Sequence, residues 1–178
     1  GTMGAGIAYA LMQSGSAVTL VERDDEAAAS ARARVSGLLD AAVSRGLTSA
    51  DKAAAQLTSM RFQAGYDDLQ DAGLAIEAAF EDMVVKKDVL AALDSAMPDA
   101  VLATNTSYLD INKMAGWLTD PSRLVGLHFF SPAHIMKLLE IVRGKASSDM
   151  ALATGFALAK RLGKLPVMVG VCDGFVGN

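Results

Sequence analysis

The sequence predicts an α/β fold with a doubly wound, mostly parallel sheet. Short apolar strands alternate with helical segments along almost the whole chain, a pattern typical of parallel sheets covered by helices. The chain opens with a glycine-rich turn, GTMGAGIA, directly before a helical segment. The next strand ends in an acidic residue, Glu22. These three observations favour a fold of the Rossmann type, which binds dinucleotides.

The order of the elements follows from apolar periodicity and from cap residues. The first helix follows the glycine turn and is expected to end at Gly15, a C-cap residue. Further helices are expected at residues 25–45, 83–97, 111–114 and 148–162, with a short one after Thr48, whose cap resembles a capping box completed by Asp51. Strands are expected at residues 17–22, 60–63, 73–78, 101–104, 124–128, 136–142 and 166–171.

The glycine turn holds only half of a dinucleotide fingerprint. The full motif is a strand, G-x-G-x-x-G and a helix, and Gly1 and Gly4 supply only its last two glycines. We therefore expect that an N-terminal strand, central in the sheet, is missing upstream of residue 1, and that this sequence is a fragment of a longer chain. Gly1 would let the backbone approach a pyrophosphate, and the helix N-terminus would offer free N–H groups. The alternative is an ordinary glycine-rich turn.

The acidic residue Glu22 favours the interpretation of the glycine turn as part of a dinucleotide-binding site. It lies close to the roughly 20-residue spacing at which an acid meets the ribose hydroxyls of a dinucleotide. A carboxylate there would repel a 2′-phosphate, so NAD is favoured over NADP. The neighbouring Arg23 makes that preference less distinct.

Composition limits the remaining classes. The 178 residues fit one domain, and 52% hydrophobic residues exclude a disordered chain. No apolar run is long enough for a membrane helix. A net charge of -4 argues against nucleic-acid binding. The single cysteine, Cys172, permits no intrachain disulfide, which fits a cytoplasmic protein, and one cysteine with two histidines predicts no metal centre.

Two side chains are the strongest candidates for chemistry. His128 follows a predicted strand, at the edge where parallel sheets bind ligands. Glu140 interrupts the apolar run LLEIV, and a carboxylate in a buried strand is costly unless it is paired. A pair of the two would orient the imidazole and raise its proton affinity, as in a base supported by an acid. The alternative is a solvated glutamate on an edge strand and a structural histidine.

Other polar residues carry less weight by themselves. Ser107 ends the sequence NTS after a strand, where a local side-chain turn is the alternative. His134 lies in a loop after a proline and is interpreted as structural. Glu81 and Lys86 flank a helix start and, taken alone, would be ordinary surface charges. Asn178, the last residue, carries no argument of its own.

Five ordered motifs resemble one family. GTMGAGIA, EAAFEDMVVKK, NTSYL, GLHFFSPAHIMKLLEIV and DGFVGN are similar to segments of the NAD-binding domain of L-3-hydroxyacyl-CoA dehydrogenases. The segment SPAHIMKLLEIV most resembles the branch of this family that is fused inside multifunctional fatty-acid oxidation enzymes. The resemblance implies NAD-dependent, reversible oxidation of L-3-hydroxyacyl-CoA to 3-ketoacyl-CoA, in β-oxidation or related acyl-CoA metabolism. Two alternatives are another 3-hydroxyacid dehydrogenase and a non-catalytic NAD-binding relative.

The resemblance also implies roles and domain limits. His128 resembles the catalytic base, Glu140 its carboxylate partner, and Ser107 and Asn178 the polar residues at the substrate. Matching cofactor positions are Gly1, Thr2, Met3, Gly4, Glu22, Arg23, Ala79, Phe80, Glu81, Lys86, Asn105, Ser107 and Ser131. Residues 1–172 would form the NAD-binding domain, and residues 173–178 would begin the connection to an absent helical domain that makes a homodimer. The full-length parent would be a dimer or a multidomain enzyme acting on acyl-CoA.

The sequence departs from the family at several positions. Ser131 replaces a common asparagine, and Glu22 a common aspartate. Leu38 and Arg45 lie near positions where relatives place a serine and a lysine against coenzyme A, and that role is not carried over to them.

Overall fold

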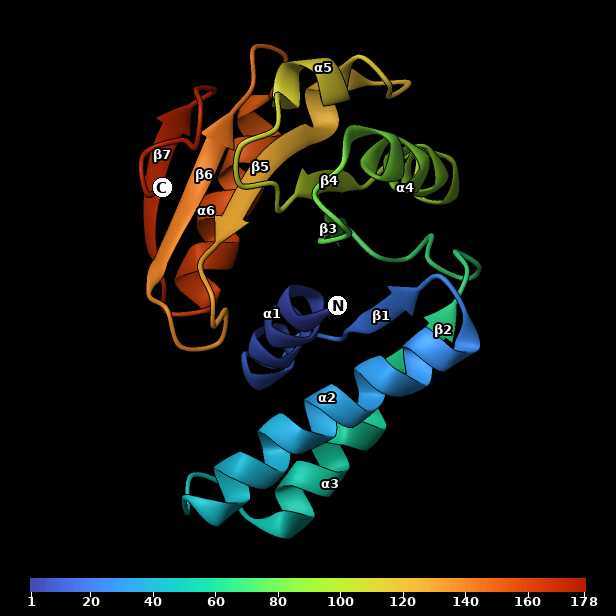
Figure 1. Cartoon of the computed structure of the whole chain (residues 1–178), viewed down its shortest axis with the longest axis vertical. Coiled ribbons are helices and arrows are strands. Elements are labelled where there is room, and N and C mark those ends of the chain that lie inside the picture. The colour runs from blue at the N-terminus through green and yellow to red at the C-terminus, as the bar shows by residue number, and fades with distance from the viewer. The chain divides into compact units, whose positions relative to one another are not determined.

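The structure is a computed structural model that describes residues 1–178 and contains two compact units (Figure 1). Unit 1 comprises Gly1–Gly65 with Ser131–Ile135, and unit 2 comprises Tyr66–Phe130 with Met136–Asn178. No helix combines the length and the apolar character that a membrane crossing requires.

Unit 1 consists of three helices and a small parallel sheet. Its elements are α1 (Thr2–Gln13), β1 (Thr19–Glu22), α2 (Asp25–Ser44), α3 (Ala50–Ser59) and β2 (Arg61–Ala64). Strands β1 and β2 pair in parallel with Leu20 opposite Phe62. Figure 1 shows α2 and α3 side by side, running in opposite directions. Small and branched side chains such as Ala8, Leu20 and Val35 form the core between the helices and the strands.

The ends of the unit 1 helices follow the predicted cap chemistry, with one exception. Gly15 follows α1 with φ of 81°, so the predicted glycine end of the helix is confirmed. Asp24 caps α2 by accepting the Ala27 N–H at 2.7 Å. The prediction that Thr48 caps α3 was wrong by one residue, because the hydroxyl of Ser49 accepts the Lys52 N–H at 3.2 Å.

Unit 2 is built on a five-stranded sheet. The strands are β3 (Leu74–Glu77), β4 (Val101–Thr104), β5 (Leu124–Phe129), β6 (Leu138–Arg143) and β7 (Leu165–Gly170), in the order β3-β4-β5-β6-β7. Only β5 and β6 run antiparallel, so the predicted mostly parallel α/β class is confirmed. The seven strands fall into two sheets, and β1 and β3 each have a single neighbour.

The helices of unit 2 lie against both faces of its sheet. They are α4 (Met83–Ala96), α5 (Ile111–Ala115) and α6 (Asp149–Arg161), with a 3-10 turn at Pro121–Arg123. A Cβ on Gly126 of β5 would lie 2.4 Å from Ile111 Cδ1 of α5, whereas Gly155 of α6 approaches the next residue, Leu127. Because side chains alternate along a strand, α5 and α6 cover opposite faces. His128 therefore lies on the face that Gly126 leaves open for α5.

Candidate functional site

The glycine turn of unit 1 leaves a helix N-terminus without a cap. Gly1 precedes α1, and no side chain accepts a hydrogen bond from the first turn. The N–H groups of the first turn and the positive end of the helix dipole are thus available to an anion.

Glu22 lies at the same place as this helix end. The N-terminal ammonium group of Gly1 lies 2.6 Å from Glu22 Oε1, at the carboxyl end of β1. Arg23 instead extends into solvent and pairs with Asp24 at 3.0 Å. The donors of α1 and the acid of β1 therefore match the two polar ends of a nucleotide sugar-phosphate, with N–H groups for phosphate and a carboxylate for ribose hydroxyls.

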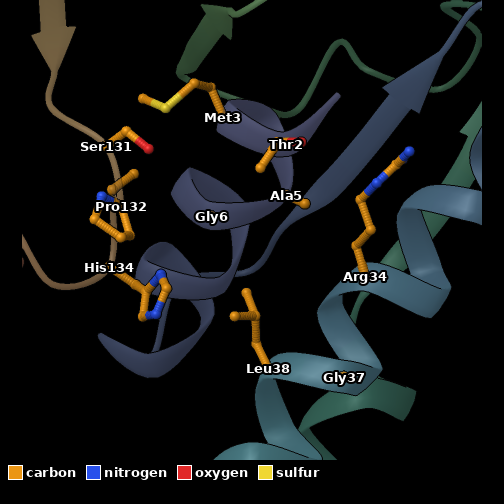
Figure 2. A pocket seen from close by; sticks show the side chains of 11 residues that line it. Thr2, Met3, Ala5, Gly6, Arg34, Gly37, Leu38, Ser131, Pro132 and His134 are labelled. Atoms are coloured by element: carbon orange, nitrogen blue, oxygen red, sulfur yellow. The ribbon is translucent and has the colours of Figure 1, made fainter.

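A pocket of about 330 Å³ adjoins the same end of α1 (Figure 2). Helix α2 contributes Arg34, Gly37 and Leu38, and the third wall is the 131–134 loop. The predicted structural role of His134 agrees with its edge-on packing against Tyr9, with ring centroids 5.4 Å apart. Further lining residues are Thr2, Met3, Ala5, Gly6, Ser131, Pro132 and Ala133. The pocket is mostly apolar, and Arg34 is the charged side chain among the residues that line it.

In unit 2, His128 and Glu140 form a buried pair. They lie directly opposite each other in the antiparallel register of β5 and β6. His128 Nδ1 is 2.8 Å from Glu140 Oε2, and the two residues are 5% and 1% exposed. The alternative of a solvated glutamate on an edge strand was wrong, since β6 is flanked by β5 and β7. The pair can hold the imidazole in one orientation and leave Nε2 for proton transfer.

Residues 172–178, here called the terminal segment, complete the surroundings of this pair. The Val176 and Gly177 N–H groups both donate to Glu140 Oε1, at 3.0 and 2.9 Å. Two aromatic rings pack beside His128, Phe130 with a centroid distance of 4.4 Å and Phe175 with one of 5.7 Å. The segment predicted to begin a connection therefore also contributes to the site.

A second buried ion pair lies at the ends of β3 and α4. Lys86 is 0% exposed, which corrects its interpretation as an ordinary surface charge. Its Nζ lies 2.8 and 3.0 Å from the two oxygens of Glu77, and 3.3 Å from Glu81 Oε2. Glu77 also accepts hydrogen bonds from the Thr104 hydroxyl and the Ala79 N–H. The network fixes the carboxyl ends of β3 and β4 relative to each other.

Glu81 extends this network to Ser107. Its Oε1 accepts the Thr106 hydroxyl at 2.5 Å, the Ser107 N–H at 2.7 Å and the Ser107 hydroxyl at 3.2 Å. Partial burial raises the pKa of the Glu81 carboxyl, but the hydrogen bonds from Thr106 and Ser107 and the charge of Lys86 outweigh it and lower the pKa below 4.5. A charged Glu81 thus orients the hydroxyl of Ser107.

The remaining predicted residues divide between the units. Gly1, Thr2, Met3, Gly4, Glu22, Arg23 and Ser131 belong to unit 1, and Ala79, Phe80, Glu81, Lys86, Asn105, Ser107, His128, Glu140 and Asn178 belong to unit 2. Asn105 Oδ1 accepts the Phe129 N–H at 2.9 Å, and Asn178 Nδ2 donates to the Ser107 carbonyl oxygen at 2.9 Å. Phe80 is 78% exposed. The Asn178 bond joins the terminal segment to the Ser107 loop.

Sequence reasoning missed several members of the site. Glu77 carries the same signal as Glu140, an acid inside an apolar strand, and could have been found by it. Thr106 and Phe130 stand next to predicted residues without a distinguishing pattern. The backbone N–H groups of Val176 and Gly177 leave no trace in side-chain identity.

Comparison with known proteins connects both units to one family. Residues 1–172 match the family model described as 3-hydroxyacyl-CoA dehydrogenase, NAD binding domain. The chain is 43% identical over 180 residues to the peroxisomal bifunctional enzyme of Danio rerio, covering 100% of this chain and 24% of that protein. It is 39% identical over 179 residues to the fatty acid oxidation complex subunit alpha of Pseudomonas putida, covering 100% and 25%. The chain thus spans about a quarter of the length of these relatives.

A solved structure shares the fold. The crystal structure of (S)-3-hydroxybutyryl-CoA dehydrogenase from Ralstonia eutropha superposes with a TM-score of 0.96 at 36% identity, covering 100% of this chain and 63% of that one. The match to the family model covers all but the last six residues, and the predicted resemblance is confirmed. The chain belongs to the 3-hydroxyacyl-CoA dehydrogenase family, and it matches the NAD-binding domain of that family.

Proposed function

We propose that this chain is the NAD-binding and proton-transferring part of an enzyme that reversibly oxidises L-3-hydroxyacyl-CoA to 3-ketoacyl-CoA. The observation that carries the proposal is the buried His128–Glu140 pair, with Nδ1 held at 2.8 Å from the carboxylate. A histidine oriented by a buried acid is the arrangement that general base catalysis needs. The reaction would belong to fatty-acid β-oxidation or to related acyl-CoA metabolism.

The N-terminal end of α1 fits the phosphates of NAD. Its first-turn N–H groups have no side-chain cap. The Glu22 carboxylate would accept hydrogen bonds from the ribose hydroxyls and would repel a 2′-phosphate, which favours NAD over NADP. Thr2, Met3, Gly4 and Ser131 belong to the same unit, while Arg23 extends into solvent. Bound NAD supplies the hydride acceptor.

His128 performs the proton transfer in this proposal. Its Nδ1–H donates to Glu140 Oε2, so Nε2 is the free acceptor and takes the proton of the substrate 3-hydroxyl as the hydride leaves C3. The carbon–oxygen bond becomes a carbonyl, and the proton passes from Nε2 to solvent afterwards. Glu140 balances the positive charge that the imidazole gains during this step.

Ser107 and Asn178 are assigned to the reacting end of the substrate. The hydroxyl of Ser107 is oriented by Glu81, and Asn178 is joined to the Ser107 carbonyl. In unit 2, Lys86, Ala79, Phe80 and Asn105 are assigned to the cofactor side. Since Lys86 is fully buried on Glu77 and Glu81, it would act through Glu81.

The test is a spectrophotometric assay of NADH oxidation by the purified full-length protein with acetoacetyl-CoA. We expect turnover that collapses in His128→Gln, about 10²- to 10⁴-fold in kcat, while NADH affinity stays near the wild-type value. Turnover of free acetoacetate in place of the thioester would favour a free-acid dehydrogenase. NADH binding without turnover of either would favour a non-catalytic relative.

The parent protein is proposed to contain more than this domain. The chain spans about a quarter of the relatives' length, which supports a multidomain enzyme. By the family resemblance, residues 173–178 would lead to a helical domain that covers the acyl-CoA and forms a homodimer. A free thiol at Cys172 fits the reducing cytoplasm. Light scattering of the full-length protein tests the dimer directly.

A further inference from the structure

Glu140 uses its two oxygens for different partners. Oε2 binds His128, while Oε1 receives two consecutive backbone N–H groups, from Val176 at 3.0 Å and from Gly177 at 2.9 Å. The residue is 1% exposed, so water does not compete for these positions. A buried carboxylate is costly unless hydrogen bonds compensate for its lost hydration. Two main-chain donors on one oxygen supply that compensation on the side away from the histidine.

The backbone of the terminal segment is shaped for this contact. Gly174 and Phe175 both have positive φ, 66° and 53°, immediately before the two donors. Such a turn aims successive N–H groups at one point and forms an anion-binding concavity. Positive φ is unfavourable for a bulky residue, so other contacts must hold Phe175 there. Its ring is 6% exposed and packs beside His128.

Gly177 permits the approach because it has no side chain. A Cβ at this position would lie 2.4 Å from Phe130 Cζ, 2.8 Å from Phe130 Cε1 and 3.5 Å from Glu140 Oε1. Gly177 does not have positive φ, so the demand for glycine comes from close approach rather than from backbone conformation. Phe130 in turn packs against the imidazole with its ring tilted by 45° and the ring centroids 4.4 Å apart. The Phe130 ring thus lies between Gly177 and the His128 imidazole.

We propose that the turn at residues 174–177 is a main-chain nest that positions Glu140, and that Gly177 is a positioning residue for the His128–Glu140 pair. The nest keeps the carboxylate aimed at Nδ1, and the Asn178 bond ties the same turn to the Ser107 loop. A side chain at residue 177 would push the amides away from Oε1 and free the carboxylate to rotate. This inference rests on the proposed function of the pair as a general base.

The first experiment compares Gly177→Ala with Gly73→Ala in the full-length protein. Gly73 is an exposed unit 2 glycine whose added Cβ would meet nothing within 4 Å, so it is the matched control. We expect Gly177→Ala to lower kcat about 10- to 100-fold, the effect of a small misplacement of a catalytic group. NADH affinity should change little, because Gly1 and Glu22 belong to unit 1 and residue 177 to unit 2, and Gly73→Ala should behave as wild type.

Proton NMR gives a readout that is independent of turnover. The Nδ1–H of His128, assigned by its absence in His128→Gln, should resonate downfield in wild type and in Gly73→Ala. It should move upfield or exchange away in Gly177→Ala. A second change, Phe130→Leu, removes the Cε1 and Cζ atoms that a side chain at residue 177 would meet. The drop in kcat caused by Gly177→Ala should therefore be smaller in the Phe130→Leu protein than in wild type. Wild-type kcat together with an unmoved Nδ1–H in folded Gly177→Ala would overturn the proposal.

The amides can be tested even if Gly177→Ala does not fold. In wild type, the Val176 and Gly177 amide protons should exchange slowly, and Glu140→Gln should weaken their protection because a neutral carboxamide is a poorer acceptor. Equal protection in the two proteins would overturn the nest. If the wild-type protein turns over no hydroxyacyl-CoA but its amides respond as described, the proposed function fails and the nest stands.

Discussion

Lys86 and Glu77 form a doubly hydrogen-bonded ion pair, with Nζ 2.8 and 3.0 Å from the two carboxylate oxygens and neither side chain in contact with solvent. The pair joins the first turn of α4 to the end of β3. Through Glu81 it also reaches Ser107. The position of the Ser107 loop therefore depends on the buried Lys86–Glu77 pair and on the half-buried carboxylate of Glu81, which contacts both Lys86 and Ser107.

Removing one partner of this pair should be strongly destabilising. Lys86→Met leaves Glu77 buried without its cation, which typically costs about 3–5 kcal/mol in the free energy of unfolding. The neighbouring Lys87 is exposed, so Lys87→Met should change it by less than about 0.5 kcal/mol. Urea unfolding of the three proteins measures both values.

A double variant separates charge from packing. Glu77→Gln/Lys86→Met removes both charges; the glutamine oxygen can still accept the Ala79 N–H, while its NH₂ group takes the place of the oxygen that accepts the Thr104 hydroxyl, so that hydroxyl has to rotate and accept instead. It should be more stable than Lys86→Met alone. A double variant at least as unstable as the single one would show that the ion pair is not the source of the loss.

The pH dependence of stability should report Glu81. Its pKa in the folded protein lies below 4.5, so the folded state favours the charged form. That contribution to stability is fully present at pH values well above the unfolded-state pKa and is lost as the pH falls through the lower folded-state pKa. The stability difference between wild type and Glu81→Gln should therefore narrow as the pH falls below 4.5. Parallel stability curves in urea titrations across this range would contradict the assignment.

Local patterns in the sequence predicted most of the fold. The predicted helix at residues 83–97 is α4 at Met83–Ala96, and the predicted strand at residues 101–104 is β4. Both follow from apolar periodicity and flanking breakers, which act within a few residues. The division of the strands into two sheets depends on pairing between distant segments, and periodicity contains no information about it.

The candidate site was predictable where a side chain contradicts its surroundings. Glu140 in an apolar strand was found in this way, and Glu77 has the same signature. Lys86 is spaced four and seven residues from Leu90 and Leu93 on α4, all three buried, so its burial was also encoded in the helical period. The Val176 and Gly177 amides were beyond reach, because every residue except proline carries the same N–H group.

Glu22 should decide the choice of dinucleotide. The carboxylate proposed to accept hydrogen bonds from the ribose hydroxyls is lost in Glu22→Gln, and a hydrogen bond to a charged group contributes about 1.5–3 kcal/mol. NADH should bind about 10- to 100-fold more weakly, and the preference over NADPH should shrink because the repulsion of the 2′-phosphate is gone. Glu26→Gln, an exposed change in the first turn of α2, is the control. Fluorescence titration with NADH and NADPH measures both affinities, and an unchanged ratio would remove Glu22 from the cofactor site.

Arg34 should distinguish coenzyme A from shorter thioesters. It is the charged residue lining the pocket beside α1, which Leu38 also lines (Figure 2). Its guanidinium could pair with a phosphate of coenzyme A, a charge-assisted contact. Arg34→Ala should then raise the KM for acetoacetyl-CoA about tenfold, the lower end of what such a bond contributes. The KM for acetoacetyl-pantetheine, which has no phosphate, should not change. Arg45→Ala tests the other candidate, because Arg45 caps the C-terminal end of α2, outside the pocket lining. Equal effects of Arg34→Ala on the two thioesters would mean that Arg34 does not contact a phosphate. An effect of Arg45→Ala on acetoacetyl-CoA alone would assign the phosphate to the far end of α2.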